Sequence, residues 1–77
     1  DDKKILAKSS STEETVMKLL AHMKEDSHQV ITLYYGEDVK EDEAEALCGV
    51  IAEKYPDCDV DYHSGGQPVY YYIISLE

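Results

Sequence analysis

A chain of 77 residues has room for one small domain, and its 17 acidic residues against seven lysines and no arginine give a net charge of -10 at pH 7. A surface of that sign repels nucleic-acid phosphates and anionic lipids, so it argues against both as partners and favours a basic protein surface. Arginine also provides the two-pronged grip on carboxylates and phosphates, and its absence argues against an anionic small-molecule substrate.

The sequence contains no sign of a membrane span or an export signal. No apolar run approaches the ~20 residues that cross a bilayer, and the N-terminus lacks the basic and then apolar pattern of a signal peptide. We therefore expect a cytoplasmic protein with no membrane insertion. Cys48 and Cys58 have no CxxC motif, which predicts two reduced thiols rather than a disulfide. Because Asp1 is not a methionine, we expect residues 1–77 to be one domain cut from a longer chain.

The N-terminal third predicts a short strand followed by a helix. Residues 4–7 form the candidate strand, and the Ser and Thr residues at 9–12 break regular structure and offer N-cap oxygens. Ser11 and Glu14 have the spacing of a capping box. Apolar residues then recur at helical intervals, so a helix is predicted to end near Lys24.

The middle of the chain predicts a buried strand and a second helix. Residues 30–35 are β-branched and aromatic, as in a strand buried on most of both faces. Asp38 is the expected cap of the next helix, with Glu41 three residues later, and Pro56 is expected to stop it. Gly49 weakens the helix interior, which we interpret as a close approach of a neighbouring backbone. The predicted apolar stripe is Ala44, Leu47, Cys48, Ile51 and Tyr55.

The C-terminal third predicts two strands joined by a turn. Acidic and apolar residues alternate over 57–62, which is typical of a half-buried edge strand. The acids Asp57, Asp59 and Asp61 are predicted to point one way, and Cys58, Val60 and Tyr62 the other. Residues 69–76 are almost continuously apolar, as in a central strand. The turn between them is predicted from a structural motif of Gly65, Gly66, Gln67 and Pro68.

These elements predict an α/β fold of order β-α-β-α-β-β, with α+β as the two-layer alternative. We expect a four-stranded mixed sheet, two helices packed on it and a C-terminal β-hairpin. The hairpin would place the last strand between the second and third, making a split β-α-β unit. Right-handed crossovers favour both helices on one face. The other face would carry Tyr34 and alternate residues of the 70–72 segment, a tyrosine-rich patch on which the rest of a parent chain would pack.

Searches for reactive chemistry give little. The Ser-Gly-Gly-Gln segment lacks the Walker lysine and joins two strands, so it is not a phosphate-binding loop. The aspartates of 57–61 do not begin a calcium loop, because Tyr62 and Pro68 replace the glycine and glutamate that it needs. The histidines lie at no recognised zinc-ligand spacing, and no base stands near Ser9–Ser11 to activate a nucleophile. We therefore assign no catalytic, cofactor-binding or metal-binding residue.

Two segments carry a resemblance to a known family: Val30-Ile-Thr-Leu-Tyr-Tyr-Gly-Glu-Asp-Val39 and Gly65-Gly-Gln-Pro-Val-Tyr-Tyr-Tyr-Ile-Ile-Ser-Leu-Glu77. They resemble the extreme C-terminus of the kinase subunit of bacterial fatty acid kinase, a dihydroxyacetone-kinase-like (DAK phosphatase) family whose C-terminal domain is related to DegV fatty-acid-binding proteins. The resemblance implies that the parent transfers phosphate from ATP to a fatty acid on a DegV-type carrier, for phospholipid synthesis. ATP and magnesium would bind the parent's N-terminal domain. This segment would be one subdomain of the C-terminal domain, without a catalytic residue.

The resemblance and the charge both predict a docking module that receives a basic protein surface. A purely structural subdomain, packed on the rest of the parent kinase, is the alternative, and an enzyme in its own right is the weakest hypothesis. Such charge contacts would speed association and would be sensitive to salt. The candidate docking residues are Asp57, Asp59, Asp61, Glu41, Asp42 and Glu45.

Overall fold

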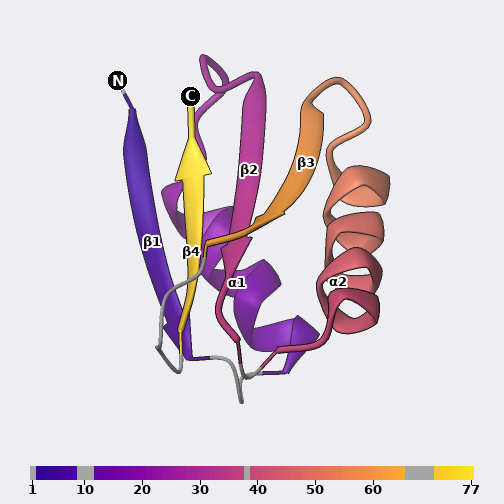
Figure 1. Cartoon of the computed structure of the whole chain (residues 1–77). Helices are drawn as coiled ribbons and strands as arrows, with labels where there is room; N and C mark the ends of the chain where they lie inside the picture. The colour runs from indigo at the N-terminus through magenta and orange to yellow at the C-terminus, as the bar shows by residue number, and fades with distance from the viewer. Residues whose placement is uncertain (1, 9–11, 38, 66–70) are drawn as a thin grey trace.

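The computed structural model describes residues 2–8, 12–37, 39–65 and 71–77. They form six elements in the predicted order, shown in Figure 1. Within these residues, no helix is long and apolar enough to cross a membrane. The elements are β1 (Lys3–Lys8), α1 (Glu13–Met23), β2 (Val30–Tyr35), α2 (Glu41–Lys54), β3 (Asp59–Ser64) and β4 (Tyr71–Leu76).

The strands form one mixed sheet in the order β1-β4-β2-β3. β4 runs antiparallel to both of its neighbours, whereas β2 and β3 are parallel. The four-stranded mixed sheet, the acidic edge strand and the central last strand are confirmed. The predicted position of the last strand is wrong, because β4 lies between β1 and β2 instead of between β2 and β3. β3 and β4 run in opposite directions, as in the expected hairpin, but β2 separates them in the sheet.

β4 lies between β1 and β2 because both strands present apolar residues to it. Ile5 of β1 and Leu33 of β2 are both in register with Ile74 of β4, and all three side chains are buried. β1 and β2 are therefore parallel strands joined through α1, with β4 inserted between them. The split β-α-β unit exists, but it is the first such unit of the chain and not the second.

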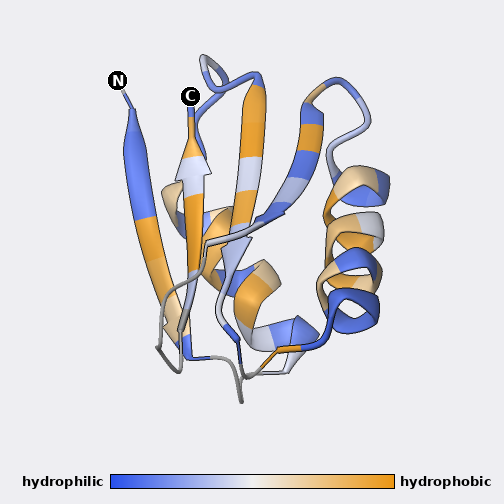
Figure 2. Ribbon diagram, in the orientation of Figure 1, coloured by the Kyte–Doolittle hydropathy of each residue, from blue (hydrophilic) through white to orange (hydrophobic). Residues whose placement is uncertain are grey.

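Both helices pack on the same face of the sheet, as predicted (Figure 1). Along the strands, apolar and polar residues alternate in Figure 2, and the apolar ones of one face meet the apolar stripes of the helices. The core cluster lies between these two layers. Its fully buried side chains are Val16, Leu20, Ile31, Leu33, Ile51, Ile74 and Leu76.

No helix among the described residues covers the opposite side of the sheet, which we call the open face. Strand register places Leu6, Ile73, Tyr34 and His63 there in one row across all four strands. The rings of Tyr34 and His63 lie with centroids 6.0 Å apart. Leu6, at the β1 end of the row, is 65% exposed.

The predicted tyrosine-rich patch is mostly absent from this face. Tyr34 lies on it, half-buried, but Tyr72 is buried on the helix face, in register with Ala7. Tyr70 lies outside the described residues. The tyrosines divide in this way because alternate residues of a strand point to opposite faces, so neighbouring tyrosines cannot share one.

Several local predictions are corrected by the helix ends. The N-cap of α1 is Thr12, whose hydroxyl accepts a hydrogen bond from the Thr15 amide at 3.2 Å; Ser11 lies outside the described residues. α2 begins at Glu41 after Lys40, which makes no side-chain cap, and the predicted cap Asp38 also lies outside them. No neighbouring atom lies within 4 Å of a Cβ built on Gly49, so the predicted close backbone approach is wrong. Both helices end where expected, at Met23 and Lys54.

Candidate docking surface

The candidate docking residues gather mainly around β3, the strand at one edge of the sheet. Asp59 and Asp61 project from β3 on the open face, where they are in register with Val30 and Thr32 of β2. Glu41, Asp42 and Glu45 occupy the first turns of α2, which packs on the other face beside β3 (Figure 1). All five side chains are exposed. We call these five residues the acidic edge.

Tyr62 connects the helix side of the acidic edge to the strand. Its hydroxyl donates a hydrogen bond to Glu45 Oε2 at 3.5 Å. Partial burial raises the pKa of the Tyr62 hydroxyl, and the negative charges of Glu45 and then Glu41 raise it further. These effects locate both glutamates beside β3, so the acids of α2 and those of the strand form one continuous region.

Asp61 also closes the free edge of the sheet. The amides of Asp59 and Gly65 donate to carbonyls of the β2 side of the sheet, so the intervening Tyr62 amide points away from β2. Asp61 Oδ1 accepts that outward amide at 2.8 Å, and its Oδ2 lies 3.2 Å from His63 Nε2. A charged side chain that occupies an edge amide discourages another strand from pairing there.

The acidic edge is not neutralised by the chain's own lysines. The ion pairs between described residues are Lys3 with Glu25, Lys18 with Glu14 and His63 with Asp61. None of them includes Glu41, Asp42, Glu45 or Asp59. A set of exposed like charges in this state attracts a basic surface more strongly than a set already paired.

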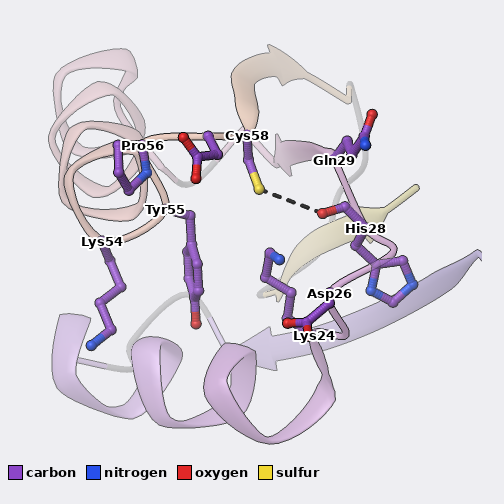
Figure 3. Close-up of a pocket in the computed structure, with 9 residues that line it drawn as sticks. Lys24, Asp26, His28, Gln29, Lys54, Tyr55, Pro56 and Cys58 are labelled. Carbon is purple, nitrogen blue, oxygen red and sulfur yellow. Dashed lines mark hydrogen bonds between the residues drawn. The ribbon is translucent and has the colours of Figure 1, made fainter.

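Asp57 does not belong to the acidic edge. β3 begins only at Asp59, and Asp57 lies in the preceding turn, so the predicted row of three aspartates contains two. Asp57 instead lines a hollow of about 310 Å³ at the other end of α2, together with Lys24 and Lys54 (Figure 3). The two lysines offset its charge there.

The same hollow contains one of the two cysteines. Both thiols are free: Cys48 is buried in α2, and Cys58 is half-buried at the hollow. Figure 3 shows the Cys58 thiol directed at the backbone carbonyl of His28, with a sulfur–oxygen distance of 3.5 Å. The Lys24 ammonium group lies 5.1 Å from the centre of the Tyr55 ring, which holds the two helix ends together.

Sequence reasoning missed Tyr62 and His63 as parts of the site. Tyr62 was assigned to the inward side of the strand, which is correct, but its hydroxyl extends to Glu45 at the margin. His63 follows the last predicted strand residue, although the alternation that placed Asp59 and Asp61 on one face places His63 there as well. Gly65 of the predicted turn motif donates its amide to the Tyr35 carbonyl at 2.8 Å, and Gly66, Gln67 and Pro68 lie outside the described residues.

The full length of the chain, residues 1–77, matches a family model, FakA-like C-terminal, which describes the C-terminal domain of a fatty acid kinase subunit. The chain belongs to this family. The resemblance found in the 30–39 and 65–77 segments is thereby confirmed.

Relatives of this FakA-like C-terminal domain are much longer proteins. Protein YloV of Bacillus subtilis (strain 168) is 42% identical over 59 residues, which are 77% of this chain and 11% of YloV. The uncharacterized protein SAR1202 of Staphylococcus aureus (strain MRSA252) is 36% identical over 74 residues, 96% of this chain and 14% of that protein. The uncharacterized protein SH1689 of Staphylococcus haemolyticus (strain JCSC1435) is 34% identical over 76 residues, 99% and 14%. The chain thus spans at most 14% of these relatives.

Proposed function

We propose that this domain is a non-catalytic docking module of a fatty acid kinase subunit. Its acidic edge binds a DegV-type fatty-acid-binding carrier, so that a kinase domain elsewhere in the parent can phosphorylate the bound fatty acid with ATP and magnesium. The observation that supports this proposal is the acidic edge itself, five exposed carboxylates on both sides of an edge strand. Family membership supports the kinase-subunit context.

The chemistry of the acidic edge suits recognition of a protein. Its carboxylates follow a strand and the start of a helix instead of converging on one point, and no group of three or more potential ligand side chains among the described residues is placed to hold a metal ion. A row of exposed acids is complementary to a row of lysines or arginines on a partner. Exposed charges of this kind contribute mainly to association rate and partner choice, and salt screens them.

The proposal is tested with full-length kinase subunit, purified carrier and two matched double variants. Glu41→Gln with Asp42→Asn removes two charges from the first turn of α2, and Glu13→Gln with Glu14→Gln removes two from the first turn of α1. Two exposed charges worth about 0.2–1 kcal/mol each predict a loss of affinity of roughly 2- to 30-fold for the α2 pair. The α1 pair should leave the affinity unchanged.

Salt dependence and the strand residues provide a second measurement. Affinity for the carrier should fall as salt rises, and the fall should be less steep in the α2 variant. Asp59→Asn should add to its effect, since the asparagine is the same size and only the charge is lost. Absence of binding at low salt, or an equal loss of affinity in the α1 and α2 variants, would contradict the proposal.

A further inference from the structure

The open face has the composition of a packing surface, with an apolar centre and charged margins. The row Leu6, Ile73 and Tyr34 forms the centre, across three strands. On one side of it, β1 carries the exposed Lys4 and Lys8; on the other, β3 carries the acids already described. A shallow hollow of about 260 Å³ lies in this face, lined by Lys4, Tyr34, Ile73, Ser75 and Glu77. The exposed Leu6 is therefore part of a continuous surface and not an isolated apolar side chain.

The size of the open face limits what can occupy it. Four strands of six residues, spaced ~4.8 Å apart with a rise of ~3.3 Å, cover roughly 400 Å². A stable complex between separate proteins usually buries about 800 Å² on each partner. The open face alone is too small for a stable complex with a separate protein or a second copy. A segment of the same polypeptide needs less area, because the linkage supplies a high effective concentration.

We propose that the open face is covered by the part of the parent polypeptide that precedes residue 1, which packs an apolar surface on Leu6, Ile73 and Tyr34. The chain makes up at most 14% of the relatives it matches, so a longer parent contains ample polypeptide to do this. The family model places this segment at the C-terminal side of its parent, so the preceding polypeptide reaches β1, the edge strand that borders the open face. Lys4 and Lys8 predict acidic residues on the covering segment where it passes β1.

The covering segment and the carrier would then use different surfaces. The apolar row lies towards β1, β4 and β2, whereas the acidic edge surrounds β3 at the other side of the sheet. The proposal uses only the membership of a longer protein from the proposed function and does not depend on carrier docking. Its failure can therefore be distinguished from failure of the docking proposal.

Hydroxyl-radical footprinting of the full-length protein tests this arrangement with internal controls. Leu6 is 65% exposed in the domain, whereas Leu19 on α1 is half-buried. If nothing covers the open face, Leu6 is oxidised faster than Leu19. If the parent chain covers it, the order reverses and Leu6 reacts about fivefold more slowly than Leu19, since the centre of a packed interface excludes solvent as a protein interior does. Tyr34 and the half-buried Tyr55 form a second pair of the same residue type.

Three controls identify the covering element. Protection of Leu6 should persist when the full-length protein is diluted a hundredfold and when the carrier is absent. Protection lost on dilution would indicate a second copy, and protection only with carrier would indicate the carrier; either result would overturn the proposal. Leu6→Gln should raise the oxidation of Tyr34 in the full-length protein and leave the affinity for the carrier unchanged. Rapid oxidation of Leu6 under all conditions would also overturn it.

Discussion

Two neighbouring isoleucines in β4 offer a direct test of the two-layer architecture. Ile74 is fully buried against the helix face, in register with Ile5 and Leu33, whereas Ile73 is half-buried on the open face. Ile→Ala at either position removes the same atoms from the same central strand, so the change in strand propensity cancels in the comparison. Only the environment of the side chain differs.

The expected magnitudes differ clearly. Truncating a fully buried isoleucine removes its transfer free energy and leaves a cavity, which costs about 2–5 kcal/mol. At Ile73 no enclosed cavity forms, and partial loss of about 0.8 kcal/mol per buried methylene amounts to roughly 1 kcal/mol. A domain of this length has a free energy of unfolding of about 4–12 kcal/mol, so Ile74→Ala removes a large fraction of it.

Thermal unfolding of the 77-residue domain, followed by circular dichroism, measures the difference. Each kcal/mol shifts the Tm of a domain this small by roughly 4–8 °C, so Ile74→Ala should unfold at least about 8 °C below Ile73→Ala when their costs differ by about 2 kcal/mol. Chemical denaturation provides the same comparison if Ile74→Ala is unfolded at room temperature. Equal destabilisation by the two changes would refute the assignment of the helices to one face.

Two further predictions concern titratable groups. Burial raises the pKa of the Cys48 thiol, and the charge of Asp61 adds to this, so a thiol reagent at neutral pH should modify Cys58 first in the folded chain and both cysteines equally in denaturant; faster reaction at Cys48 would contradict its placement. A hydrogen bond and the charge of Lys3, whose Nζ lies 2.6 Å from Glu25 Oε2, lower the pKa of the Glu25 carboxyl below 4.5. Because the folded-state pKa is lowered, this pair stabilises the domain above pH 4.5 and the contribution is lost as pH falls through the lowered pKa. Lys3→Met should move the Glu25 titration, measured by NMR, upward, and an unchanged titration would contradict the pairing.

Sequence patterns predicted most of the elements because their signals are local. The β-branched run at 30–35 and the period of two around Val60 fix strand type and burial face without information from the rest of the chain. Pro56 marks the end of α2 through its missing amide and its fixed φ. The acidic nature of the edge also followed from the alternation, since Asp59 and Asp61 must share a face once the segment is a strand.

Strand order and the exact membership of the site depend on contacts distant in sequence. The prediction paired the last strand with the one before it, as consecutive strands often do, but β4 is in register with Ile5 and Leu33 on two other strands. Asp57 continues the alternating pattern and was included for that reason. Only the structure shows that β3 begins at Asp59 and that a turn directs Asp57 towards Lys24 and Lys54. Proximity of Glu45 to Tyr62, 17 positions away, likewise depends on the packing of α2 on β3.

The hydrogen bond made by Asp61 restricts how a partner can use the acidic edge. Because Asp61 already accepts the outward amide of Tyr62 at 2.8 Å, a partner strand would have to displace that carboxylate before it could pair with β3. A carrier that contacts side chains avoids this step, since the Asp59, Glu41 and Asp42 carboxylates are exposed without any rearrangement. Edge protection and docking therefore do not compete: the carboxylate that prevents strand pairing also contributes charge, and binding through side chains uses that charge while the backbone remains closed.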